Sequence, residues 1–476
     1  MKLLHIVLIP TMAQGHMIPM LDMAKLFTSR GLRATIITTP SFSAPITQAR
    51  LSGFNIGLVV TPFPPQGSSL PQNIVSFDQM TDPDLASKFL GAMELLQEPV
   101  EEILQQLRPD CIISDMFLPW TADSAAKFSI PRLAFYGTGF FARCLSEKFE
   151  IHKPLDNVTM TSDPEAILVP GLPHELKFVI PQLCPFFLEE TANDFTKMFE
   201  KMNESWKKTY GEVVNSFDEL ESGYANHYKN VIGRKAWEIG PLLLCSEKNH
   251  HRGNESAIDE HECLAWLDSK KPNSVVYVCF GSLATFSRAQ LTETAAALEA
   301  SGQDFIWVVR KNERDEEDWV PLGFEERVRN KGLIIRGWAP QVMILYHVSV
   351  GAFVTHCGWN STLEGVCAGV PMVTWPLFAE QFFNEKLVTE VLGTGVSVGN
   401  KRWMLRDSEG VEREAVARAV EEVMVGGGAE EMRRRAQRYK EMAKKAVEED
   451  GSSYNNLNDL IEELSNYVAP TKQDIN

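Results

Sequence analysis

The chain has 476 residues, of which 44% are hydrophobic, and 46 basic residues against 63 acidic ones give it a net charge of −17. At roughly 150 residues per domain this length indicates two or three domains, and the apolar content is sufficient for packed cores. Disordered and fibrous proteins are therefore excluded. Because the charge repels a phosphate backbone, we expect no nucleic-acid partner, and a phosphate-bearing ligand must be held by local dipoles and a few side chains.

The eight cysteines are scattered without a Cys-x-x-Cys pair, which is typical of buried thiols in a reducing compartment. The apolar stretch at the N-terminus is short and interrupted by His5, so we expect no signal peptide. No run approaches the roughly 18 apolar residues that a membrane span needs. The sequence predicts a cytoplasmic protein without a transmembrane segment.

The first half of the chain opens with an apolar run at 3–9, a segment of helical spacing at 17–31 that ends at Gly31, and a β-rich segment at 32–39. This order predicts a βαβ unit. Further strand-like runs lie at 55–61, 111–114 and 132–135, and a helical pattern covers 86–107. We therefore predict a parallel sheet covered by helices.

The second half repeats this alternation. Its predicted strands are 274–280, 305–310, 333–338, 351–355 and 371–375, and its predicted helices include 287–302 and 361–369. A polar, charged stretch follows the Gly240-Pro241 turn and marks a domain boundary. The predicted limits are a first domain at 1–245, a linker at 246–260, a second domain at 261–455, and a C-terminal helix and tail at 456–476 that pack back on the first domain. The fold class is α/β, with two doubly wound domains whose strand ends line a cleft.

Two residues in the first domain suggest acid–base chemistry. His16 follows the first strand at the head of the first helix, and Asp115 directly follows the run at 111–114. Because both stand at carboxyl ends of parallel strands, a hydrogen-bonded pair is geometrically reasonable. A neutral imidazole can take a proton from a hydroxyl while a carboxylate fixes its tautomer. A helix-capping or surface role for either residue is the alternative.

The densest pattern in the second domain begins after the strand at 351–355. There His356 and Gly358 precede a helix that carries Ser361 in its first turn. A glycine at a helix start admits an anion, and the helix dipole supplies positive charge. Glu364, one turn deeper, can accept hydrogen bonds from ribose hydroxyls, and Trp338 can offer its indole face to uracil. Singly, Trp338 would be read as core and Glu364 as a solvated helix residue, but their joint spacing favours a nucleotide site.

The 44 residues of Trp338–Gln381 open with Trp-Ala-Pro-Gln, contain His-Cys-Gly-Trp-Asn-Ser and close with Glu-Gln. This segment resembles the signature box of plant secondary-product UDP-sugar glycosyltransferases of family 1. The resemblance extends over essentially the whole chain through Gly15-His16 and the SVVYVCFGS strand. It implies a GT-B type fold, in which two Rossmann-like domains face a central cleft and bind the acceptor and the UDP-sugar. It further implies inverting transfer of glucose to flavonoid, phenolic, steroid or triterpenoid aglycones.

The resemblance also implies residue roles, with His16 as the general base and Asp115 as its partner. Thr138 is placed toward the sugar, and Gln381 argues for UDP-glucose as donor. Glu380 departs from the Asp more usual before that glutamine, which weakens a claim of strict glucose preference. The residues assigned to the donor are Thr138, Ser282, Trp338, Ala339, Gln341, His356, Trp359, Asn360, Ser361, Glu364, Glu380 and Gln381.

Aromatic residues near predicted strand ends suit a flat, hydrophobic alcohol or phenol as acceptor, with core packing as the alternative. The acceptor candidates are Phe117, Trp120, Phe140, Phe186 and Phe187. The segment 82–84 matches a metal-binding Asp-x-Asp, but it contains a proline and follows no strand, so we interpret it as a solvated turn. We therefore predict no metal and no cofactor.

The sequence favours a monomeric UDP-glucosyltransferase whose partners are a UDP-sugar and a small-molecule sugar acceptor. One alternative keeps the chemistry but uses UDP-galactose, UDP-glucuronate or UDP-xylose as donor. Another is a catalytically silent protein that binds a nucleotide sugar. A dinucleotide-dependent dehydrogenase is disfavoured because neither Gly-Thr-Gly segment completes a Gly-x-Gly-x-x-Gly motif after a strand.

Overall fold

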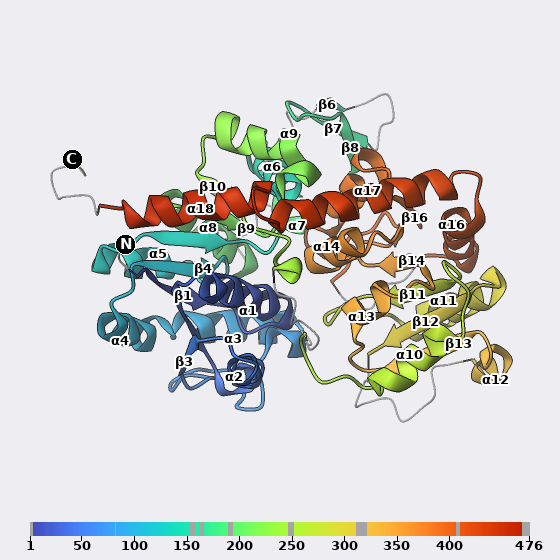
Figure 1. Ribbon diagram of the computed structural model, residues 1–476, viewed down its shortest axis with the longest axis horizontal. Helices are drawn as coiled ribbons and strands as arrows, with labels where there is room; N and C mark the ends of the chain where they lie inside the picture. Colours follow the sequence, from blue (N-terminus) through green and yellow to red (C-terminus); the bar gives the residue numbers. More distant parts are fainter. Residues whose placement is uncertain are drawn as a thin grey trace. The chain divides into compact units, whose positions relative to one another are not determined.

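The computed structural model describes residues 3–80, 82–151, 159–160, 166–188, 194–245, 252–310, 321–405 and 410–468. The chain forms two compact units, and most of their helices and strands are labelled in Figure 1. The first unit comprises Met1–Gly139, Glu189–Gly253 and Lys445–Asn476, and the second comprises Phe140–Leu188 and Asn254–Lys444. Residues 246–251 of the predicted linker and 469–476 of the predicted tail lie outside the described residues. The domain limits given above stay a prediction.

The first unit is built on a seven-stranded sheet in the order β10-β9-β5-β4-β1-β2-β3, and every paired strand in it runs parallel. The strands are β1 His5–Ile9, β2 Arg33–Thr38, β3 Ile56–Val60, β4 Cys111–Asp115, β5 Arg132–Phe135, β9 Gly211–Val214 and β10 Ala236–Glu238. Central strands β1 and β4 are buried at all five positions, as expected of a parallel sheet that helices cover on both faces.

The helices of the first unit are α1 Gln14–Ser29, α2 Ser43–Leu51, α3 Pro83–Glu94, α4 Gln97–Leu107, α5 Thr121–Phe128, α8 Asp194–Lys208, α9 Asp218–His227 and α18 Ser452–Ser465. In α1, Met17, Met20 and Phe27 are buried at helical spacing. The helix ends at Ser29, and Gly31 follows in the left-handed conformation at φ +77°. The predicted helical pattern at 86–107 is instead two helices. Pro99 has no amide hydrogen and occupies the first turn of α4, where no such donor is needed.

The second unit has a six-stranded parallel sheet in the order β13-β12-β11-β14-β15-β16. Its strands are β11 Val275–Cys279, β12 Asp304–Val309, β13 Gly332–Arg336, β14 Val350–Thr355, β15 Met372–Thr374 and β16 Gly395–Ser397. Its helices are α6 Phe140–Ile151, α7 Pro185–Leu188, α10 Glu260–Asp268, α11 Arg288–Ser301, α12 Phe324–Val328, α13 Gln341–Leu345, α14 Trp359–Ala368, α15 Gln381–Lys386 and α16 Arg413–Val425. The long helix α17 Ala429–Val447 belongs to this unit as far as Lys444, and its remaining residues belong to the first unit. The predicted α/β class with two parallel sheets is confirmed.

The segment 140–188 joins the second unit through aromatic packing. It contains α6, α7 and a small antiparallel sheet of β6 Thr159–Met160, β7 Ala166–Val169 and β8 Leu176–Val179. The ring of Phe383 on α15 lies 5.7 Å from Phe149, 5.4 Å from Phe178 and 6.4 Å from Phe187 between centroids. Such ring pairs stabilise a fold beyond the burial of their apolar surface. They therefore hold segment 140–188 against α15.

The C-terminal helix α18 completes the core of the first unit. Its Leu457, Leu460 and Leu464 belong to the same buried cluster as β1 and α1, and the helix packs against β10. Within the ranges that the structure covers, no helix combines the length and apolar character needed to cross a membrane.

We expect Leu460→Ala to lower the free energy of unfolding of the first unit by about 2–5 kcal/mol, because the fully buried side chain leaves a cavity. Thermal unfolding monitored by circular dichroism measures this change. Leu51→Ala, at a leucine of the same unit that is 77% exposed, is the matched control and should leave the transition nearly unchanged.

Candidate active site

His16 and Asp115 are in direct contact in the first unit. His16 lies in the first turn of α1 and Asp115 ends β4, which pairs with β1, so the two strand ends bring them together. The His16 Nδ1 and the Asp115 Oδ2 are 2.5 Å apart. The carboxylate is fully buried, whereas the imidazole is 22% exposed. The histidine therefore links a buried negative charge to a surface that a ligand can reach.

Two further donors hold the Asp115 carboxylate. The Thr11 hydroxyl donates to Oδ1 at 2.8 Å, and the Phe117 amide donates to the same oxygen at 3.0 Å. A buried carboxylate needs such bonds, since an unsatisfied charge is costly in the interior. Thr11 was missed by the sequence reasoning, although it follows β1 and the strand-end argument used for His16 would have reached it.

Aromatic side chains border His16. The Phe117 ring lies 5.6 Å from the imidazole between centroids, and Phe77 stacks on Phe117 at 6.4 Å. Phe117 therefore lies beside His16, and its role in acceptor binding stays a prediction. Phe77 was not predicted, because nothing in its spacing separates it from a core residue.

The other four acceptor candidates are buried. Trp120 donates its indole N–H to the Met93 carbonyl at 3.1 Å. Phe140, Phe186 and Phe187 belong to the second unit and are 0%, 4% and 8% exposed. Their contacts are those of core side chains, and a role in acceptor binding stays a prediction for them.

Thr138 follows β5 in the first unit. Its hydroxyl oxygen is buried and has no hydrogen-bond partner in the part of the chain that the structure describes. An unpaired buried hydroxyl carries a free-energy penalty that a bound hydroxyl group would relieve. This geometry suits the predicted contact with a sugar.

The turn after β14 is the place where the sequence predicts anion binding in the second unit. Cys357 adopts φ +64°, and Gly358 is the N-cap of α14, which has neither a side-chain cap nor an acidic residue in its first turn. The amides of Trp359, Asn360 and Ser361 therefore lie at the positive end of the helix dipole. Of these three residues, Trp359 and Ser361 are buried and Asn360 is half-buried.

His356 is enclosed by two glycines in this turn. A Cβ at Gly281, which has φ +74°, would lie 2.8 Å from the imidazole Cε1, and one at Gly358 would lie 2.5 Å from Nε2. Ser282 follows Gly281 directly after β11 and is half-buried. Burial lowers the pKa of His356 to about 4, so the ring is neutral near pH 7 and offers an N–H rather than a positive charge.

A second group of predicted residues is linked by hydrogen bonds. Gln341 begins α13, and its Nε2 donates to Glu364 Oε2 at 2.6 Å and to Ser361 Oγ at 3.2 Å. Trp338 precedes α13 and is partly exposed, while Ala339 is buried. The structure therefore brings together Gln341, Ser361 and Glu364, which come from two different helices.

The closing pair of the motif lies at the start of α15. Gln381 accepts through Oε1 from the amides of Leu377 and Phe378, at 2.8 and 3.0 Å. Glu380 accepts from Asn384 Nδ2 at 3.2 Å, and the same nitrogen donates to the Cys357 carbonyl at 2.8 Å. Asn384 thus ties α15 to the turn that carries His356. Its i, i+4 spacing from Glu380 was the signal in the sequence that could have identified it.

The segment 82–84 is a helix start. Asp82 caps α3 by accepting from the Leu85 amide at 2.9 Å, and Asp84 pairs with Lys88 at 2.6 Å. Across the described ranges, no group of three or more His, Cys, Asp or Glu side chains is arranged to hold a metal ion.

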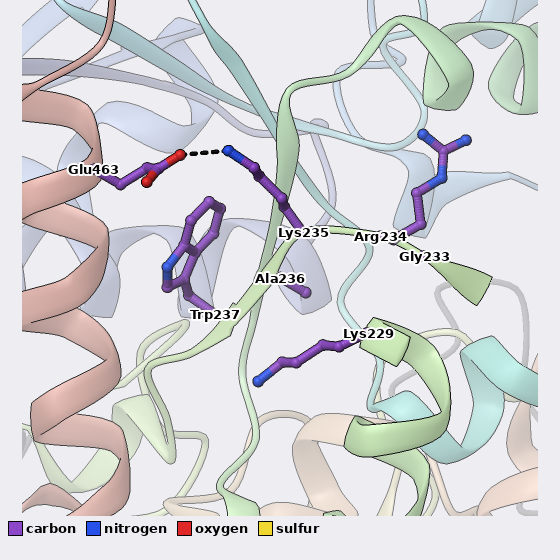
Figure 2. Close-up of a pocket in the computed structure, with 7 residues that line it drawn as sticks. All are labelled: Lys229, Gly233, Arg234, Lys235, Ala236, Trp237 and Glu463. Carbon is purple, nitrogen blue, oxygen red and sulfur yellow. Dashed lines mark hydrogen bonds and ion pairs between the residues drawn. The ribbon is translucent and has the colours of Figure 1, made fainter. Parts of the chain in front are cut away.

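A pocket of about 360 Å³ lies elsewhere in the first unit, where β10 meets α18 (Figure 2). Its lining residues are Lys229, Gly233, Arg234, Lys235, Ala236, Trp237 and Glu463. Figure 2 shows Lys235 paired with Glu463, and Lys229 pairs with Glu238 at 2.6 Å. Carboxylates already neutralise these two ammonium groups, and none of the predicted site residues lines the pocket.

Comparison with known proteins agrees with this arrangement. Residues 184–431 match the family model of UDP-glucoronosyl and UDP-glucosyl transferases. The scopoletin glucosyltransferase of Nicotiana tabacum is 56% identical over 98% of this chain and 99% of its own. The anthocyanin 3'-O-beta-glucosyltransferase of Gentiana triflora is 50% identical over 98% and 99%.

Among solved structures, that of Glycyrrhiza uralensis UGT73P12 complexed with glycyrrhetinic acid 3-O-monoglucuronide has a TM-score of 0.89. It is 40% identical and covers 98% of this chain and 96% of its own. The chain therefore belongs to the plant family 1 UDP-glycosyltransferases, enzymes that transfer a sugar from a UDP-sugar. Its two α/β units have the GT-B fold that the sequence predicted.

The lowered pKa of His356 makes a prediction about stability. The unfolded state takes up a proton near pH 6.5 and the folded state only near pH 4, so stability falls as the pH drops through this window. Glutamine cannot take up this proton. We therefore expect the free energy of unfolding of His356→Gln to fall by about 1–2 kcal/mol less than that of the wild type when the pH is lowered from 7 to 5. Urea unfolding between pH 4.5 and 7 measures it, with His261→Gln, at an exposed histidine of the same unit, as control. A pH-independent difference between wild type and His356→Gln would contradict the prediction.

Proposed function

We propose that the protein transfers glucose from UDP-glucose to a hydroxyl of a hydrophobic phenolic metabolite, giving a β-glucoside and UDP. The observation that carries the proposal is the His16–Asp115 hydrogen bond beside the ring of Phe117. His16 can act as a base, and the neighbouring Phe117 ring provides an apolar surface for the acceptor. Relatives that are 50–56% identical are named for glucosyl transfer to scopoletin and anthocyanin, which supports glucose as the sugar and a phenol as the acceptor.

The acceptor step uses the tautomer that Asp115 imposes. With Nδ1–H donating to the carboxylate, Nε2 carries the lone pair that removes the proton from the acceptor hydroxyl. The oxygen then attacks the anomeric carbon while the bond from that carbon to the UDP oxygen breaks. Proton and positive charge end on His16, where the buried carboxylate stabilises them. A single displacement of this kind inverts the anomeric configuration.

The donor step uses the second unit. The first-turn amides of α14, the neutral imidazole of His356 and the hydroxyl of Ser282 hold the diphosphate and stabilise the charge that develops on UDP. Trp338 stacks on uracil and Glu364 binds the ribose. The resemblance assigns Gln341, with Ala339, to the edge of uracil, but Gln341 donates to Glu364, so we place it beside the ribose. This route uses dipoles and hydrogen-bond donors in place of a metal ion.

The acceptor is proposed to be flat and apolar. Phe117 contacts a small cluster in which Leu90 of α3 and Met198 and Met202 of α8 are buried beside the partly buried Phe199. Phenolic rings pack well against such a surface. A steroid or triterpenoid alcohol is the second candidate, because the solved Glycyrrhiza relative holds a glycyrrhetinic acid conjugate. A mass-spectrometric screen with UDP-glucose and both acceptor classes distinguishes them.

Cytoplasmic location and a monomeric state are part of the proposal. All eight cysteines are free thiols, and seven of them are buried, as in proteins of a reducing compartment.

We expect His16→Ala to lower kcat at least about 100-fold with little change in the KM for UDP-glucose, because the base is lost and the nucleotide site is not. Asp115→Asn should lower kcat about 10- to 1,000-fold. Transfer of radiolabelled glucose to a phenolic panel measures both. Asp84→Asn is the control, since this exposed carboxylate pairs with Lys88. Equal activity of His16→Ala and wild type would overturn the assignment of the base.

The donor assignment is tested at position 381. Gln381→His removes the oxygen that accepts from Leu377 and Phe378, so the start of α15 should shift and kcat/KM for UDP-glucose should fall about tenfold. Competition between UDP-glucose and UDP-galactose reports the preference. If the variant keeps the wild-type glucose preference, this residue does not decide the donor sugar.

A further inference from the structure

Tyr277 is a buried residue of the second unit to which the chemistry above gives no role. It lies in the middle of β11 with no exposed surface, and its ring stacks on Phe353 at 5.2 Å between centroids. Its hydroxyl donates to Gln341 Oε1 at 3.2 Å. Burial raises the pKa of the phenol well above its usual value, so the group stays a donor at every pH at which the enzyme is assayed.

The Gln341 amide is held in one orientation by Glu364 and is anchored at its other end by the Tyr277 hydroxyl. Its Oε1 faces the Tyr277 hydroxyl, and its Nε2 faces Glu364 Oε2 at 2.6 Å. If the amide rotated by half a turn, its carbonyl oxygen would lie against the Glu364 carboxylate and its NH₂ group against the phenol. The first contact is repulsive, because two acceptors would meet. Tyr277 and Glu364 therefore hold the amide from opposite ends.

We propose that Tyr277 is a positioning residue of the nucleotide site, which holds the Gln341 side chain beside Glu364 so that both residues bind the ribose. The inference rests on the proposed function. Ribose hydroxyls that donate to Glu364 compete with Gln341 Nε2 for the same carboxylate. Once the nucleotide is bound, the Tyr277 hydroxyl therefore continues to hold the amide in place, and its effect falls on nucleotide binding rather than on proton transfer.

The test is isothermal titration of the full chain with UDP, for wild type, Tyr277→Phe, Gln341→Ala and the double variant. Tyr277→Phe removes one hydrogen bond and keeps the ring and its stacking on Phe353. We expect it to weaken UDP binding about three- to tenfold, and to raise the KM for UDP-glucose similarly with kcat within about twofold. In the Gln341→Ala background the same change should have almost no effect, since the amide that it holds is gone.

The double-variant comparison separates positioning from packing. If Tyr277→Phe weakens UDP binding equally in both backgrounds, or leaves it unchanged in the wild-type background, the inference fails while the proposed function stands. If the wild-type chain itself binds no UDP, the proposed function fails and the inference fails with it. Tyr439→Phe, at a half-buried tyrosine on α17, is the matched control and should bind UDP like wild type. Melting temperatures of all variants show that they are folded.

Discussion

The structure of the first unit depends on one constraint, which is that a fully buried carboxyl group at the end of a central strand must have its oxygens hydrogen-bonded. Asp115 satisfies it with three hydrogen bonds, from the Thr11 hydroxyl, the Phe117 amide and the His16 ring. Each donor comes from the segment after β1 or β4, so the parallel pairing of these strands is what assembles the group. The same bonds fix the orientation of the imidazole and give it a defined proton acceptor, Nε2.

In the second unit, the predicted site is for an anionic ligand rather than built on a buried carboxyl group. The proposed diphosphate site of a protein with a net charge of −17 relies on the helix N-terminus at Gly358, which supplies amides and a dipole. Two glycines enclose His356 so closely that side chains at either position would collide with its ring. Burial keeps this imidazole neutral, which makes it a hydrogen-bond donor suited to phosphate and unsuited to proton transfer near neutral pH.

Much of this could be predicted from the sequence because it follows from strand ends and helix starts. The βαβ alternation predicted both sheets, and the positions of His16 after β1 and of Asp115 at the end of β4 predicted their pairing. Contacts made by long side chains across the fold could not be predicted in this way. The Tyr277 hydroxyl reaches Gln341 over 64 residues of sequence, and Phe383 joins segment 140–188 to the second unit through rings that look like ordinary core residues. The break between α3 and α4 was overlooked because Pro99 lies within an otherwise regular helical pattern.

The central claim is that the hydroxyl activated by His16 attacks the anomeric carbon directly and expels UDP in one step. The anomeric configuration of the product, read by proton NMR from the coupling of its anomeric hydrogen, tests this claim most directly. UDP-α-glucose and a phenolic acceptor should give the β-glucoside as the first product. An α-glucoside would mean that the anomeric configuration is retained, which a single in-line displacement cannot give, and would contradict the account.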